Sequence, residues 1–188
     1  MPTNHGQILL PIARAAISQK LGKTYPANEN SSWLQEHRAC FVTLTQHEQL
    51  RGCIGTLEAH RSLLADVRAN ALAAAFHDPR FAPLTKAELD YTEVEVSLLS
   101  MMQDMVFASE QDALEQLRPQ IDGIVFEYGR YRSTFLPQVW EQLPDPVEFM
   151  AHLKHKAGLH PRFWDESVRL YRYTVNKWKE SDLESLSE

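Results

Sequence analysis

Residues 41–55 have the sequence FVTLTQHEQLRGCIG. The β-branched and aromatic side chains of Phe41–Thr45 are typical of a β-strand. A polar tetrapeptide, Gln46–Gln49, follows and has the composition of a hairpin loop. We therefore predict two antiparallel strands over residues 40–57, and the second strand contains the hexapeptide Leu50-Arg51-Gly52-Cys53-Ile54-Gly55.

A thiol lies between the two glycines of this second strand. A glycine inside a strand usually marks a β-bulge or the close approach of another group. Because side chains alternate between the two faces of a strand, we expect Arg51, Cys53 and Gly55 on one face. The Arg51 guanidinium would then favour the nucleophilic thiolate form of Cys53, and Gly52 and Gly55 would admit a substrate. The alternative is that Cys53 is a small core side chain, which is the commoner role of a cysteine in a strand.

The pairing of the two strands also predicts the position of the second cysteine. With a four-residue loop, Val42 would face Cys53 and Cys40 would face Gly55. Cys40 and Cys53 would then be diagonal neighbours on one face, in a geometry too oblique for an easy disulfide. Two cysteines in 188 residues do not make a disulfide framework, so we expect both thiols to be reduced.

Composition and charge restrict the class of protein. Hydrophobic residues make up 44% of the chain and charged residues 23%, which is ordinary for a globular protein. A formal charge of −6 and a pI near 5.8 argue against binding to duplex nucleic acid, which normally needs a basic surface. The first residues lack the features of a signal peptide, and no apolar run is long enough to span a membrane. We therefore expect a cytoplasmic protein.

The rest of the chain alternates between helical and strand patterns. A first helix is predicted to end near Gly22, and further helices to begin at Ser62, Ser109 and Asp145. Strands are predicted over residues 91–99, 124–128, 131–136 and 168–175, followed by a frayed acidic tail from residue 179. This order predicts the α+β class with largely antiparallel sheets.

Several polar side chains outside the hairpin could carry chemistry. Asp78 and Arg80, just after the second helix, could line a pocket or simply fix a loop as an ion pair. Thr85 and Glu88 have the spacing of a capping box. Alternation places Glu93 and Glu95 on the polar face of strand 91–99, where they could be paired carboxylates for acid–base chemistry, but solvation is the simpler interpretation. The sequence predicts no metal site, because three helical and flanking histidines have no further ligands at matching positions: His152, His155 and His160.

The hexapeptide Leu50–Gly55 resembles the signature of the AMMECR1 domain family. The resemblance continues through Asp78–Phe81, Glu95–Leu99, Leu136–Val139 and Lys156–Leu159, and so covers nearly the whole chain. It implies a fold of two unequal subdomains, of which the larger includes both ends of the chain. It also implies that the signature lies at a cleft between these subdomains.

The resemblance implies less about function, because the family has no settled biochemical activity. Prokaryotic members resemble protein A of the AmmeMemoRadiSam system, so a Memo-like protein and a radical SAM protein are the expected partners. One hypothesis is a cysteine-dependent enzyme or enzyme component, with Cys53 as nucleophile or cofactor contact and His60 or His77 as base. The other is a non-catalytic module that binds a protein or small ligand. No cofactor is assigned. The predicted catalytic residue is Cys53, and the predicted binding residues are Leu50, Arg51, Gly52, Ile54, Gly55, Asp78 and Arg80.

Overall fold

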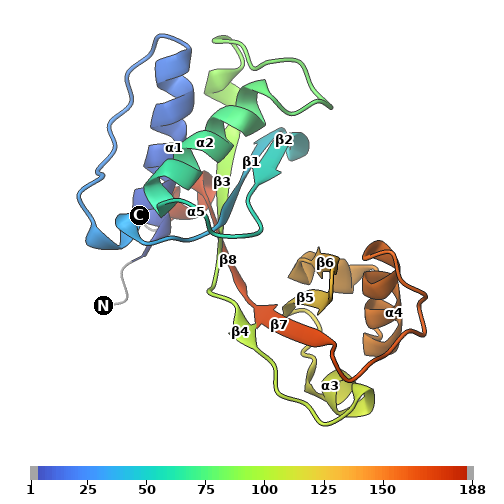
Figure 1. Cartoon of the computed structure of the whole chain (residues 1–188). Coiled ribbons are helices and arrows are strands. Elements are labelled where there is room, and N and C mark those ends of the chain that lie inside the picture. Colours follow the sequence, from blue (N-terminus) through green and yellow to red (C-terminus); the bar gives the residue numbers. More distant parts are fainter. Residues whose placement is uncertain (1–3, 186–188) are drawn as a thin grey trace. The chain divides into compact units, whose positions relative to one another are not determined.

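A computed structural model describes residues 4–185, which divide into two compact units (Figure 1). Within residues 4–185, unit 1 comprises the chain up to Leu99 together with residues 176–185, and unit 2 is Ser100–Val175. Each unit has its own cluster of buried hydrophobic side chains. The two units are therefore described separately.

Unit 1 contains a four-stranded sheet in the order β2-β1-β3-β8 within the described residues. Strand β1 pairs antiparallel with both β2 and β3. The strands are β1 (Cys40–Gln46), β2 (Gln49–Gly55), β3 (Glu93–Leu99) and β8 (Val175–Lys179). Strand β2 lies at one edge of the sheet, so one side of its backbone has no strand partner.

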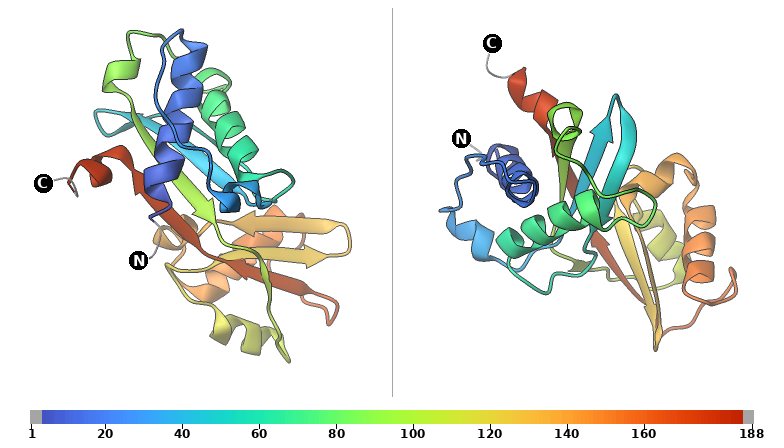
Figure 2. Two further views of the ribbon diagram at one scale, coloured as in Figure 1. Left: turned by 90° about the vertical axis from the view of Figure 1, so that its left-hand side faces the viewer. Right: turned by 90° about the horizontal axis from the view of Figure 1, so that it is seen from above.

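Two helices, α1 (Gly6–Lys20) and α2 (Leu63–Phe76), cover one face of this sheet (Figure 2). Helix α2 begins after Ser62, whose side chain accepts a hydrogen bond from the Ala65 amide, as an N-cap does. Its small side chains let the helix approach the strands closely. Two 3₁₀ turns, η1 (Ser32–Gln35) and η2 (Leu89–Tyr91), complete the unit with a short terminal helix, α5 (Glu180–Glu184).

The predicted β1–β2 hairpin is confirmed, but its register differs from the prediction. His47 and Glu48 form a tight turn with φ of 50° and 65°. Beyond Thr45, which pairs with Leu50, the register shifts by one residue, so that Arg51 is the extra residue of a β-bulge.

This bulge changes which side chains share a face. Cys53 pairs with Thr43, and Gly55 pairs with Phe41, whereas we predicted Val42 and Cys40 as their partners. A shift of one residue moves a side chain to the other face of the sheet. Cys40 is therefore in the core, fully buried, and Cys53 lies on the opposite face. The prediction that the two thiols are neighbours on one face is wrong.

Unit 2 contains the second sheet, in the order β4-β7-β5-β6, with antiparallel pairing throughout. Helix α4 packs on β6 and on α3, and the Trp140 ring stacks on Phe149 in the core with ring centroids 3.7 Å apart. The elements are β4 (Gln103–Asp104), α3 (Glu110–Gln116), β5 (Gly123–Tyr128), β6 (Tyr131–Phe135), η3 (Pro137–Glu141), α4 (Pro146–Lys156) and β7 (Arg169–Tyr173).

The α+β class with two largely antiparallel sheets is confirmed. Two predictions for the end of the chain are wrong. The expected single strand over 168–175 is divided between the two sheets as β7 and β8, and the expected frayed tail contains α5. The cleft stays a prediction. None of the described helices is long and apolar enough to cross a membrane.

Candidate functional site

Arg51, the bulge residue, points to the face that carries the helices. It is 9% exposed, and its Nε donates to Glu88 Oε1 at 3.1 Å while Nη2 donates to the Ala82 carbonyl at 2.7 Å. Gln46 lies on the same face of β1 as the buried residues Cys40, Val42 and Leu44, and its Nε2 donates to the same Glu88 oxygen at 3.4 Å. Arg51 therefore fixes the segment after α2, and the prediction that it lies beside the Cys53 thiol is wrong.

Glu88 is held as an anion by this contact. Burial alone would raise the pKa of Glu88, but hydrogen bonds from Arg51 and Thr85 lower it to about 2. The capping-box spacing is present, since Thr85 N donates to Glu88 at 2.8 Å, but it closes a turn before η2. The carboxylate thus joins the Arg51 bulge to the turn.

The two glycines of the hexapeptide make room for parts of the protein itself. A Cβ on Gly52 would lie 2.1 Å from the carbonyl oxygen of Ala74 in α2. A Cβ on Gly55 would lie 2.1 Å from the Phe41 ring, which covers that position. The space that we predicted beside Cys53 for a substrate is filled at Gly55 by Phe41.

Cys53 lies on what we call the outer face, the sheet surface of unit 1 opposite α1 and α2. The Cys53 side chain is half-buried on this face, and the Thr43 hydroxyl donates a hydrogen bond to Cys53 Sγ at 3.2 Å. Thr43 in turn pairs with Glu95 of β3. Cys53, Thr43 and Glu95 thus form one row across three strands. The Glu95 carboxylate has no hydrogen-bond or ion-pair partner within residues 4–185.

Asp78 and Arg80 bond to the free edge of β2 at Cys53. The Cys53 amide donates to Asp78 Oδ2 at 3.0 Å, and Arg80 Nη2 donates to the Cys53 carbonyl at 3.4 Å. The Arg80 side chain also donates to both Asp78 oxygens, at 3.0 and 2.7 Å. We call this pair the edge clamp, because it satisfies backbone groups that a neighbouring strand would otherwise pair with.

The edge clamp also sets the charges next to the thiol. Hydrogen bonds from Arg80, and then from the Cys53 amide, hold the pKa of Asp78 well below its usual range. The pKa of Arg80 is raised, first by the hydrogen bond with Asp78 and to a lesser extent by the neighbouring Cys53. The Arg80 side chain is 54% exposed and its Cζ lies 5.5 Å from the centroid of the Phe81 ring. Arg80 is therefore the cation beside Cys53, in the place that we predicted for Arg51.

The other predicted residues lie outside this cluster. Leu50 is 44% exposed near the hairpin turn, and Ile54 packs against the core. His77 is exposed at the end of α2, and the exposed His60 ring contacts the Glu58 carbonyl. Within residues 4–185, no histidine hydrogen-bonds to Cys53, and no group of three or more potential ligands could hold a metal ion.

Sequence reasoning missed three residues of this arrangement. The sequence predicts only a strand position for Thr43, a helix cap for Glu88 and a solvated face for Glu95. The alternation of strand 91–99 correctly placed Glu95 on the polar face. Only the bulge, however, brings Cys53 onto that same face.

Comparisons with known proteins agree with the fold. The AMMECR1 family profile matches residues 10–178. Protein MJ0810 of Methanocaldococcus jannaschii is 37% identical over 180 residues, which cover 93% of this chain and 90% of that relative. Protein LS215_2104 of Saccharolobus islandicus is 38% identical over 177 residues, which cover 89% of this chain and 78% of the relative. The crystal structure of the uncharacterized protein PH0010 of Pyrococcus horikoshii matches with a TM-score of 0.74 and 33% identity, over 93% of this chain and 91% of that one.

Proposed function

The chain belongs to the AMMECR1 family, and from this premise and the geometry around Cys53 we propose that it is a cysteine-dependent enzyme or a component of one. The observation that carries the proposal is the hydrogen bond from the Thr43 hydroxyl to Cys53 Sγ, 3.2 Å long, on the outer face. A donor fixed at the sulfur stabilises the negative charge of a thiolate nucleophile. The edge clamp holds the backbone of the same residue, so the thiol has a defined direction.

Glu95 is the proton acceptor in this proposal. Adjacent strands lie about 4.8 Å apart, so Thr43 is between the thiol and the carboxylate in their row. Asp78 contacts Cys53 directly through the Cys53 amide. Its oxygens, however, accept hydrogen bonds from Cys53 and Arg80, and its pKa is low. It is therefore a poor base. The Thr43 hydroxyl donates to the sulfur, so the proton of Cys53 would pass to Glu95 through solvent on the outer face, and Glu95 replaces the role predicted for His60 or His77.

A second candidate is a non-catalytic module that binds a protein or small ligand. The observation in its favour is that Arg51, Gly52 and Gly55 are engaged by other parts of unit 1. The exposed guanidinium of Arg80 would then anchor an anionic group of the ligand. A Memo-like protein and a radical SAM protein are the partners that we propose from the family association. The two candidates differ in whether the function of the protein needs a reactive Cys53 thiol.

Covalent labelling distinguishes the two candidates, and Cys40 is an internal control. Cys40 is fully buried, and burial, followed by Asp66, raises the pKa of its thiol well above the ordinary value. We expect a panel of small electrophiles, read out by mass spectrometry on the native full chain, to modify Cys53 at least tenfold faster than Cys40. Cys53→Ser should abolish this labelling and keep the unfolding temperature. If Cys53 reacts no faster than Cys40, the binding module is the better account.

A further inference from the structure

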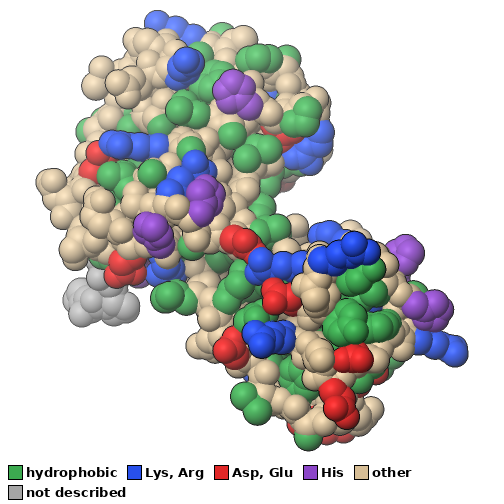
Figure 3. Space-filling view, in the orientation of Figure 1, with side chains coloured by type: hydrophobic (Ala, Val, Ile, Leu, Met, Phe, Trp, Pro, Cys, Tyr) green, Lys and Arg blue, Asp and Glu red, His purple; other side chains and the backbone are tan. Residues whose placement is uncertain are grey.

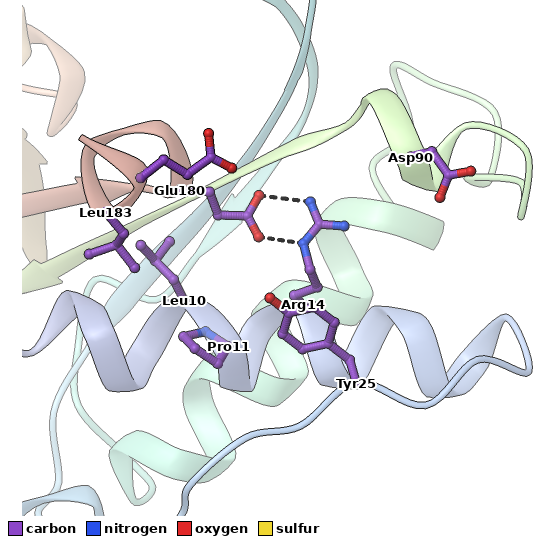
Figure 4. A pocket seen from close by; sticks show the side chains of 8 residues that line it. Leu10, Pro11, Arg14, Tyr25, Asp90, Glu180 and Leu183 are labelled. Carbon is purple, nitrogen blue, oxygen red and sulfur yellow. Dashed lines mark hydrogen bonds and ion pairs between the residues drawn. The ribbon is translucent and has the colours of Figure 1, made fainter. Parts of the chain in front are cut away.

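A pocket in unit 1, away from Cys53, is formed by four separate parts of the chain (Figure 4). Its volume is about 380 Å³, within the range of sites for small molecules. Helix α1, the turn η2, helix α5 and the Tyr25 ring contribute to it. The lining residues are Leu10, Pro11, Arg14, Tyr25, Asp90, Glu180, Leu183 and Glu184.

The floor of the pocket is an ion pair whose charges are already neutralised. Arg14 donates to both oxygens of Glu180, with Nη2 to Oε2 at 2.7 Å, and also to the Thr92 carbonyl. The Val94 amide donates to Glu180 Oε2 at 2.9 Å. The hydrogen bond that Arg14 donates to Glu180 is the main cause of the raised pKa of Arg14. This guanidinium is therefore not available to attract an anion.

The rim carries the charge that remains. Lys23 Nζ lies 3.3 Å from Asp90 Oδ1 and partly compensates the negative charge of Asp90. Glu184 is exposed and has no hydrogen-bond or ion-pair partner in the described part of the chain. The lining thus has three carboxylates against one guanidinium, and Glu184 is the carboxylate that has no cation.

Apolar surface lies next to that carboxylate. Leu10, Pro11 and Leu183 form one side of the pocket in Figure 4, with Asp90 at the far end. The Tyr25 ring is 41% exposed and already faces a cation, with Arg14 Cζ 6.0 Å from its centroid. The unpaired carboxylate of Glu184 favours a positively charged group, and the exposed part of the Tyr25 ring adds apolar surface beside it.

We infer that this pocket binds a small organic ammonium compound that has an apolar body. The body would lie on Leu10, Pro11 and Leu183 and against the exposed part of the Tyr25 ring, and the ammonium group would interact with Glu184. The site is separate from Cys53, and its occupancy does not depend on the proposed thiol chemistry.

Matched ligands test the charge requirement directly. Isothermal titration of the full chain with phenethylammonium and with 2-phenylethanol compares ligands that differ chiefly in the charged group. We expect the ammonium compound to bind at least tenfold more tightly, and less tightly as salt is added. Equal binding of the amine and the alcohol would overturn the inference.

Variants test the residues. Glu184→Gln and Tyr25→Leu should each weaken phenethylammonium binding at least threefold, because each removes a side chain that contacts the ligand. Both side chains are exposed, so their replacement leaves the core intact. Asp104→Asn, an exposed carboxylate of unit 2, and Cys53→Ser should leave binding unchanged. Unchanged binding in Glu184→Gln would show that the assigned carboxylate is not the recognition group.

Discussion

Two thiols in neighbouring strands have opposite surroundings in this protein. Cys40 faces the core, where its sulfur is 3.2 Å from Asp66 Oδ2 and burial raises its pKa. Cys53 faces away from the helices and receives a hydrogen bond from Thr43. One extra residue at Arg51 produces this difference, because it changes the face on which every later side chain of β2 lies.

At the scale of single residues, the two glycines of the hexapeptide should tolerate substitution unequally. Gly52→Ala places a methyl group against the α2 backbone at Ala74 and should lower the unfolding free energy by about 2–3 kcal/mol. Gly55→Ala should cost less, because it meets the half-buried Phe41 side chain, which can turn away. Urea denaturation measures both. A larger loss for Gly55→Ala would contradict the packing described for α2 on β2.

The elements show what the sequence could and could not predict. The hairpin, α1, α2, α4 and the polar face of β3 follow from side-chain periodicity and turn composition, which are local properties. The bulge does not, because two glycines are compatible with several registers and the contact that selects one, Gly52 on Ala74, joins residues far apart in the chain. The division between β7 and β8 at Thr174 is equally invisible, since alternation continues on both sides.

Helix α5 gives a prediction at this scale, because its first residue is anchored and its last is not. Glu180 bonds Arg14 and the Val94 amide, whereas Glu184 is exposed at the other end of the helix. Glu180→Gln should lower the unfolding free energy by about 2 kcal/mol and speed amide exchange in α5. Glu184→Gln is the matched control and should do neither. Equal stability of the two variants would mean that the acidic tail is not fixed by this pair.

The contact between the Arg51 bulge and Glu88 predicts a dependence on pH. The folded-state pKa of Glu88 is about 2, below its ordinary value of 4.5, so its contribution to stability is present above pH 4.5 and lost as pH falls toward 2. Glu88→Gln should therefore be less stable than the wild type at pH 7, and the difference should shrink below pH 4.5. Thermal unfolding from pH 7 to pH 2.5 measures it. A difference that is constant across this range would contradict the assigned ion pair.

At the scale of the whole molecule, charge restricts the partners. The net charge is −6, and on the face shown in Figure 3 basic side chains are scattered among acidic ones in both units. Duplex binding depends on neutralising phosphates, and its affinity falls steeply with salt. We therefore expect no submicromolar, salt-sensitive binding to random duplex DNA at physiological ionic strength in a fluorescence anisotropy titration. Such binding would show that a local basic surface outweighs the overall charge.

The central claim is that the Thr43 hydroxyl prepares the Cys53 thiol for chemistry on the outer face. The most direct measurement is the alkylation rate of Cys53 by iodoacetamide in Thr43→Val, with Cys40 as the internal reference. Thr45→Val is the matched control, because Thr45 lies on the same face of β1 and pairs with Leu50. The account predicts that Thr43→Val slows alkylation of Cys53 at least threefold and that Thr45→Val leaves the rate unchanged. Equal rates in the two variants, or a Cys53 that reacts no faster than Cys40, would contradict it.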